Sequence, residues 1–147
     1  MRCQRITLIR HAHPNPDQPS DPSLSDMGRK QALTLDGHFQ LVVLGPLRRQ
    51  LDTYTHSNIS GDKMAMSELL REQRSGKAYN YYRNEIPKAE TRDDAMVRVK
   101  ALKEWLRKQP ETDICMITSA FLICYFLDSC EIPRGLIGYC QRFELEI

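Results

Sequence analysis

The 147-residue sequence contains no long apolar run, no marked excess of one charge, no internal repeat and no low-complexity tract. A membrane-spanning helix needs about 18 or more consecutive apolar residues, and no segment approaches that length. The 21 basic and 19 acidic residues are spread along the chain and leave a formal net charge of only +2, which argues against a general nucleic-acid-binding surface. The N-terminal stretch is too short and too charged for a signal peptide. We therefore expect a cytoplasmic protein with neither a membrane nor a nucleic acid as partner.

The sequence also lacks the spacings that are typical of disulfide frameworks and metal sites. Its cysteines form no Cys-x-x-Cys pair, are odd in number, and in three cases lie in apolar runs. We predict that they are buried free thiols, since free cysteine packs as a small hydrophobic residue. The histidines and carboxylates show no ligand spacing, so no metal and no other cofactor is expected. The five cysteines are Cys3, Cys115, Cys124, Cys130 and Cys140.

What the sequence does contain is an alternation of short apolar runs and helix-like segments. Hydrophobic residues make up 41% and charged residues 27% of the chain, which is an ordinary globular balance. Short apolar strands that alternate with helices are typical of a mainly parallel sheet covered on both faces. We therefore predict the α/β class, a three-layer α/β/α sandwich, as a single domain over residues 1–147. The predicted strands are 6–9, 41–44, 64–66, 114–117 and 139–145, and the predicted helices are 26–39, 47–56, 91–109 and 120–130.

Polar residues follow directly after three of the predicted strands. Arg10 and His11 follow the first strand, residues 45–49 follow the second, and Thr118 and Ser119 follow the third core strand. In parallel α/β sheets the ligand crevice lies beyond the carboxyl ends of the strands. We therefore expect the three loops to converge on one edge of the sheet, where their arginines could bind a small anion.

Five motifs occur in an order that one protein superfamily shares, and they extend over nearly the whole chain. An Arg-His pair ends the first strand, and Leu-Ser-x-x-Gly-x-x-Gln-Ala opens the first helix. Gly-Pro-Leu-x-Arg, with a threonine four residues on, follows the second strand. Leu-x-Glu-x-x-x-Gly comes next, and Glu-Thr opens a long helix. The motifs lie at residues 9–12, 24–32, 45–53, 70–76 and 90–105. Together they resemble those of the histidine phosphatase superfamily, which is phosphoglycerate mutase-like.

The resemblance implies a role for each of four residues. His11 matches the histidine that accepts the phosphoryl group, and a neutral imidazole is a competent nucleophile near pH 7. Arg10 and Arg49 match the phosphate-binding arginines, whose planar guanidinium groups bind phosphoryl oxygens in bidentate fashion. Glu72 matches the proton donor, which protonates the leaving oxygen and then activates water. Thr53 and Arg48 are expected at most to support the site.

Some of these residues also have simpler interpretations. Glu72 lies in the charged stretch 68–74, where a solvated surface is the default, and it is preferred to Glu68 as the acid. His13 is of interest because it is two residues from His11. The three histidines interpreted as surface polar residues are His13, His38 and His56.

The sequence departs from the superfamily pattern after the third core strand. In the superfamily, a second active-site histidine at this point donates a hydrogen bond to the transferring phosphoryl group. In this sequence Ser119 occupies the matching position. A serine hydroxyl donates a neutral hydrogen bond but carries no positive charge. Loss of one preorganised donor typically lowers rates by about 10²–10³. Ala12 and Gly45 are milder departures. These differences and the short middle region argue against glycolytic mutase activity.

Two functional classes therefore stay open. The first is a phosphatase of reduced activity that acts through His11 on a small phosphorylated substrate or a phosphoprotein. The second is a non-catalytic descendant that retains the anion pocket and binds a phosphorylated ligand or a partner protein. Retention of the nucleophile, both arginines and Glu72 favours the first class. The tyrosine-rich segment 77–88 is expected to form part of the pocket roof.

Overall fold

A five-stranded sheet forms the centre of the computed structural model, which describes residues 3–18, 20–72 and 90–147. The strand order is β3-β2-β4-β1-β5. Strand β5 is antiparallel to β1, and the other neighbouring pairs are parallel, so the predicted α/β class with a mainly parallel sheet is confirmed. The strands are β1 (Arg5–Arg10), β2 (Asp36–Leu44), β3 (Asn58–Met66), β4 (Asp113–Thr118) and β5 (Arg142–Glu146).

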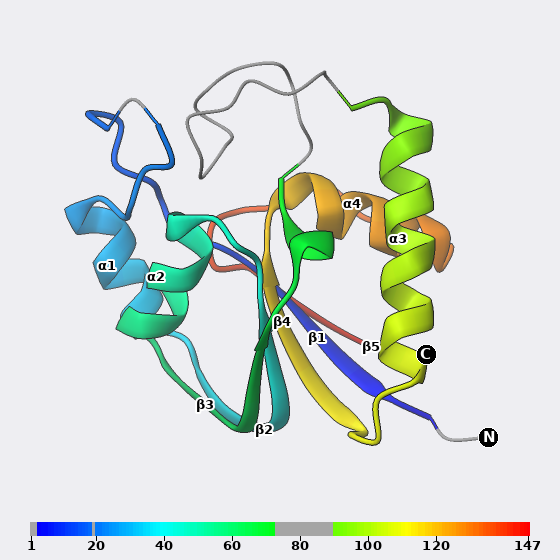
Figure 1. The fold of residues 1–147 in the computed structure, drawn as a ribbon. Coiled ribbons are helices and arrows are strands. Elements are labelled where there is room, and N and C mark those ends of the chain that lie inside the picture. The colour runs from blue at the N-terminus through cyan, green and yellow to red at the C-terminus, as the bar shows by residue number, and fades with distance from the viewer. Residues whose placement is uncertain (1–2, 19, 73–89) are drawn as a thin grey trace.

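Helices cover both faces of this sheet (Figure 1). On one face α2 packs against the sheet, with α1 beside it, and on the other face lie α3 and α4. None of the helices in the described ranges is long and apolar enough to cross a membrane. The helical elements are α1 (Asp26–Leu33), α2 (Arg48–His56), the 3-10 turn η1 (Glu68–Leu70), α3 (Arg92–Arg107) and α4 (Ala120–Ser129).

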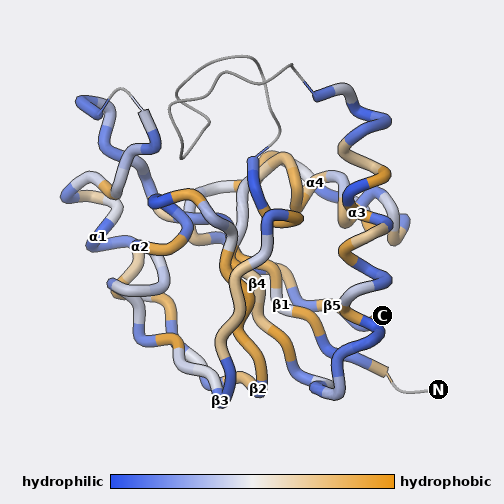
Figure 2. The backbone as a smooth tube through the Cα atoms, in the orientation of Figure 1, coloured by the Kyte–Doolittle hydropathy of each residue, from blue (hydrophilic) through white to orange (hydrophobic). Residues whose placement is uncertain are grey.

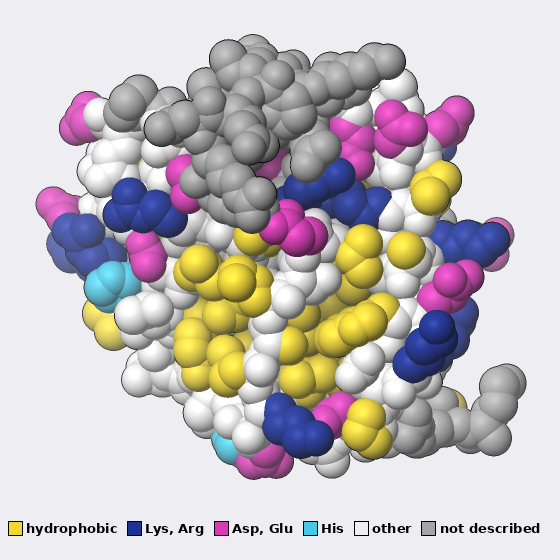
Figure 3. Space-filling view, in the orientation of Figure 1, with side chains coloured by type: hydrophobic (Ala, Val, Ile, Leu, Met, Phe, Trp, Pro, Cys, Tyr) yellow, Lys and Arg dark blue, Asp and Glu magenta, His cyan; other side chains and the backbone are white. Residues whose placement is uncertain are grey.

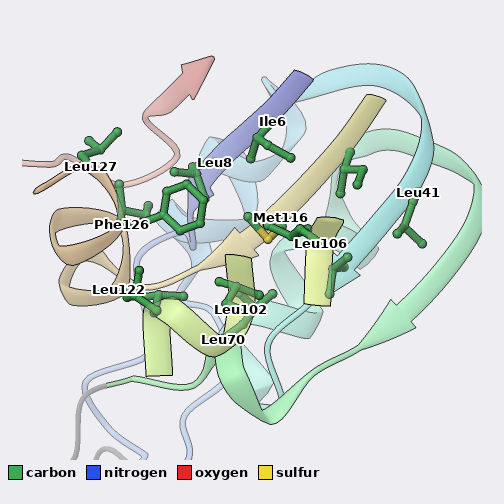
Figure 4. Close-up of a cluster of buried hydrophobic side chains, with 14 of the residues drawn as sticks. Ile6, Leu8, Leu41, Leu70, Leu102, Leu106, Met116, Leu122, Phe126 and Leu127 are labelled. Atoms are coloured by element: carbon green, nitrogen blue, oxygen red, sulfur yellow. The ribbon is translucent and has the colours of Figure 1, made fainter. Parts of the chain in front are cut away.

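The alternation of side chains along the strands divides the core into two layers. Leu8 of β1 faces α3 and α4, whereas the next residue, Ile9, packs with the α2 side. Met116 and Ile117 of β4 divide in the same way. Figure 4 shows the larger layer, in which Leu102 of α3 and Phe126 of α4 lie against strand residues. Figure 2 shows hydrophobic residues concentrated along the central strands β2, β4 and β1.

The predicted helix over 26–39 is too long, because α1 ends at Leu33 and β2 already begins at Asp36. Gly37 has a φ of 131°, which a helix does not contain. The backbone from Asp36 onward pairs instead with β3, beginning opposite Asn58. Pairing with a distant strand therefore outweighs the local helical tendency of this segment.

The two edge strands of the sheet, β3 and β5, differ in length from the predicted strands. Strand β3 runs over Asn58–Met66 rather than 64–66. It is an edge strand that is mostly exposed, so its residues are largely polar and the hydrophobic pattern predicts only its last part. Strand β5 begins at Arg142 rather than at 139. The remaining predicted helices and strands agree with the structure to within one or two residues at most ends.

All five cysteines are free, but the prediction that they are buried is right only for Cys115. Cys3 is exposed because it precedes the first strand, and the others are half-buried at helix or loop positions. Burial raises the pKa of the Cys115 thiol to about 12.

Candidate active site

The loops that follow β2, β4 and β1 meet at one edge of the sheet, because these three strands are neighbours. The backbone N–H of His11 donates to Thr118 O at 2.9 Å, and that of Gly45 donates to Ile117 O at 3.1 Å. In Figure 1 this edge is the upper end of the sheet, where α2 and α4 begin. The three polar segments expected to converge therefore lie side by side.

His11 is the centre of this cluster and is only 3% exposed. The Nε of Arg49 donates to its Nε2 at 3.3 Å, and its Nδ1 lies 2.8 Å from Ala12 O. A guanidinium has no acceptor, so Nε2 carries the lone pair and Nδ1–H donates to the carbonyl. Burial, followed by the charge of Arg49, holds the pKa of His11 well below its usual value. The imidazole is therefore neutral at pH 7, with Nε2 directed toward the arginine.

Arg49, in the first turn of α2, connects His11 with Glu72. It is 1% exposed, and its second terminal nitrogen lies 3.8 Å from Glu72 Oε2. Thr53, one turn further along α2, donates to Arg49 O at 2.6 Å and accepts from the Ala12 N–H at 2.8 Å. The threonine therefore holds the backbone beside His11 against the helix that carries the arginine.

Arg10, the residue before His11, is anchored by the segment that precedes β5. Its guanidinium donates to Ile137 O at 2.7 Å and stacks on Tyr139, with its carbon 4.0 Å from the ring centroid. The Tyr139 ring also lies 6.0 Å from the His11 ring. Tyr139 is a site residue that the sequence reasoning missed, since its alternation with neighbouring residues predicted a strand. No local signal distinguishes such a residue.

Ser119 is fully buried at the first residue before α4. Its Oγ makes no hydrogen bond to any of the residues that the structure describes, and it does not cap the helix. The hydroxyl can therefore donate to a ligand at the N-terminal end of α4, where the backbone N–H groups and the helix dipole favour an anion.

His13 is half-buried rather than a surface residue, which corrects the interpretation from the sequence. Its Nδ1 lies 2.7 Å from Ser25 Oγ, and its ring packs edge-on against Tyr139 at 5.2 Å. It lines a cavity of about 380 Å³ between the loop after β1 and the start of α1. A Cβ at Gly28 would lie 2.2 Å from His13 O, so only glycine permits this approach of α1.

The other predicted positions lie away from this cluster or outside the residues that the structure describes. His38 is exposed, as predicted, and binds Ser60 and Asp62 on the neighbouring strand β3. His56, also predicted at the surface, is instead half-buried in the last turn of α2. Residues 77–88 lie outside the described residues. Within the described ranges, no group of three or more His, Cys, Asp and Glu side chains could hold a metal ion.

Comparison with known proteins identifies the fold. No protein-family model and no curated protein sequence matches the chain. Among solved structures, phosphoglycerate mutase from Bacillus anthracis str. Sterne is similar with a TM-score of 0.75 and 15% identity, over 99% of this chain and 88% of that one. A phosphoserine phosphatase from Entamoeba histolytica, in complex with 3-phosphoglyceric acid, has a TM-score of 0.68 and 17% identity, over 96% and 89%.

A third structure, described as Mycobacterial hydrolase 2, has a TM-score of 0.72 and 19% identity, over 99% of this chain and 83% of that one. All three cover nearly the whole chain. The protein therefore has the phosphoglycerate mutase-like fold, which is the fold of the histidine phosphatase superfamily that its motifs resemble.

Proposed function

We propose that the protein is a phosphatase that hydrolyses phosphoric monoesters through a phosphohistidine intermediate at His11. The observation that carries this proposal is the state of His11, which is buried and neutral, with its proton on Nδ1 and its lone pair on Nε2. A nucleophile of this kind needs no deprotonation before it attacks phosphorus.

In the first step, the phosphoryl group of the substrate binds between the two arginines. The Nε–H of Arg49 then donates to a phosphoryl oxygen in place of His11 Nε2, which frees the lone pair for attack. The Nε of Arg10 is buried and has no hydrogen-bond partner among the described residues, so it can donate to a second oxygen. Both cations match the charge that spreads over the equatorial oxygens in the transition state.

The proton balance assigns two tasks to Glu72. As the bond to the leaving oxygen breaks, the carboxylic acid gives its proton to that oxygen, and Nε2 forms the new bond to phosphorus. The resulting carboxylate then takes a proton from water as water attacks the phosphohistidine. Phosphate leaves, and His11 and the acid return to their starting states. The 3.8 Å separation of Glu72 from Arg49 supports this role, because it brings the carboxyl group next to the phosphate-binding arginine.

Ser119 supplies a weaker donor than a histidine would in this scheme. Its buried hydroxyl can bond one phosphoryl oxygen, but it adds no positive charge. We therefore expect slow turnover, with substrate binding less affected than the chemical step.

The solved structures with this fold support the substrate class. Their descriptions name phosphoglycerate mutase and phosphoserine phosphatase, the latter bound to 3-phosphoglyceric acid. By analogy we propose that the substrate of this chain is a small phosphorylated molecule, with a phosphorylated protein side chain as the second possibility.

A second candidate function is non-catalytic binding of a phosphorylated ligand or partner. The observation that favours it is Ser119, a buried neutral donor at the N-terminal end of α4, where the resemblance implies a histidine. In this alternative the arginines hold the phosphoryl group, and no transfer to His11 follows.

The experiment that separates these functions measures turnover of a panel of phosphoesters by wild type and by His11→Ala. We expect His11→Ala to lose activity, whereas the matched control His38→Ala, at an exposed histidine, should retain it. Alkaline quenching during turnover of a labelled substrate should leave an acid-labile phosphoryl group on His11. Phosphate binding without turnover by wild type would instead support the non-catalytic function.

A further inference from the structure

A buried ion cluster connects the start of α3 with the chain just before Glu72. The carboxylate of Glu90 accepts from Arg98 at 2.8 Å and 3.1 Å and from Arg71 at 3.0 Å. Arg98 is 7% exposed, and the Glu90 side chain is 6% exposed. Figure 3 shows acidic and basic side chains gathered at this end of the face, above the hydrophobic ones.

Arg98 also binds the backbone that leads to Glu72. Its remaining terminal nitrogen donates to Leu69 O at 3.2 Å and to Arg71 O. One guanidinium therefore holds the η1 turn, the residue immediately before Glu72, and the carboxylate of Glu90. Its fork of rigid donors suits this task, whereas a lysine has a single ammonium.

Arg98 lies on a helix whose position is fixed by packing in the hydrophobic core. It lies in the 16-residue helix α3, whose buried residues Val99, Leu102 and Leu106 pack in the larger core layer. The Thr91 side chain accepts from the Asp94 N–H at the start of this helix, which fixes the helix end beside Glu90. The cluster is thus attached to a rigid element.

A line of contacts leads from this cluster to the nucleophile. Arg98 holds Arg71 O, Glu72 follows directly, and Glu72 Oε2 lies 3.8 Å from Arg49, which donates to His11. The Glu72 side chain is 11% exposed, so its position depends on the protein around it. The cluster holds the backbone on both sides of this point, because Arg98 binds the carbonyl of Arg71 and Arg71 donates to Glu72 O at 3.5 Å.

A contribution to folding stability does not by itself explain why these charged side chains are buried together. Burying two guanidinium groups with a carboxylate has a large desolvation cost, and apolar residues of similar volume often stabilise a protein as well or better. Burial and the neighbouring Arg71 lower the pKa of Arg98, in line with that cost. Buried ionic groups can instead specify one geometry.

We propose that Arg98 and Glu90 are positioning residues that hold Glu72 at the leaving oxygen of the substrate. This inference rests on the proposed phosphatase function and adds to it the residues that aim the acid. A displacement of about 1 Å in a reacting group can lower a rate by about 10²-fold. Loss of the cluster should therefore impair proton donation more than phosphate binding.

The test compares two substrates that differ in their need for an acid. The leaving group of 4-nitrophenyl phosphate departs readily without a proton, whereas that of a simple alkyl phosphate requires one. We expect Arg98→Lys to lower kcat/KM for the alkyl phosphate about tenfold or more, and that for the aryl phosphate less than about threefold. Glu72→Gln should show the same pattern more strongly, and the exposed Arg107→Lys in the same helix should resemble wild type.

A second variant and a double variant complete the test. Glu90→Gln retains the shape of the side chain, removes its charge, and should give the same selective loss if Arg98→Lys does not fold. Glu72→Gln combined with Arg98→Lys should lose no more activity on the alkyl phosphate than Glu72→Gln alone.

Equal losses on the two substrates in a folded variant, or no loss, would overturn the positioning role while leaving the phosphatase function intact. Absence of both turnover and phosphohistidine in wild type would overturn the proposed function and this inference together.

Discussion

The Nε of Arg49 donates to the Nε2 of His11 at 3.3 Å, and the two side chains are almost completely buried. The contact identifies the nitrogen that carries the lone pair, and together with burial it disfavours the imidazolium form. The same guanidinium lies beside Glu72. A phosphoryl group that takes the N–H of Arg49 would thereby release His11, the proposed nucleophile, and lie next to Glu72, the proposed acid.

The low pKa of His11 predicts how stability depends on pH. Below the ordinary histidine value of about 6.5 the unfolded chain binds a proton at this residue, whereas the folded protein does not. The free energy of unfolding should therefore decrease as pH falls from about 7 to about 5, and less steeply in His11→Asn. The slope from one group is at most about 1.4 kcal/mol per pH unit. Urea unfolding at several pH values measures it, and equal slopes would contradict the assigned state of His11.

Ser119→His should raise kcat roughly tenfold or more while changing KM only slightly. The added imidazole would donate to the phosphoryl oxygens, where charge develops in the transition state. Ser119→Ala, the matched control, removes the hydroxyl and should lower kcat. Because residue 119 is buried, a melting curve must first show that the histidine variant folds. A folded variant without gain on any substrate of the wild type would contradict this account of the site.

Arg49→Lys should weaken binding of phosphate or vanadate by about 10- to 100-fold. Hydrogen bonds to charged groups contribute about 1.5–3 kcal/mol, and each 1.4 kcal/mol corresponds to about tenfold. A lysine cannot reproduce the planar fork of donors. Arg48→Lys provides the control, because Arg48 is the exposed neighbour on the same helix. Titration calorimetry should distinguish them, and equal affinities would remove Arg49 from the anion site.

Thr53→Val should lower the free energy of unfolding by about 1–3 kcal/mol, because it leaves the buried Ala12 N–H without its acceptor. The control is Thr55→Val, at an exposed threonine of the same helix, where a surface substitution should change stability by less than about 0.5 kcal/mol. Urea unfolding of both variants tests the difference. Similar losses would show that the contact between Thr53 and the loop after β1 contributes little.

Much of the fold follows from local sequence. The apolar runs 6–9, 41–44 and 114–117 lie inside β1, β2 and β4, because strands buried on both faces need continuous hydrophobic residues. The helical spacing after Thr91 similarly predicts α3. Local sequence predicts only the end of β3, residues 64–66, because most of this edge strand is exposed and has no hydrophobic pattern of its own.

By itself, the sequence determined which chemical groups are present and at which edge of the sheet they gather. His11, Arg10, Arg49 and Ser119 follow strands or begin helices, so the α/β order alone brings them to one edge. The resemblance of its motifs to those of the histidine phosphatase superfamily, from which we propose that Ser119 stands at the position of a second histidine, also rests on the sequence alone.

Only the tertiary structure decided the state of these groups. The proton position on His11, the stacking of Arg10 on Tyr139 and the hold of Arg98 on the backbone before Glu72 all join segments far apart in the chain. A pKa or a hydrogen bond depends on burial and on distances of a few ångströms to neighbouring charges. No local pattern of residues encodes those distances, because they arise only when the helices and loops pack together on the sheet.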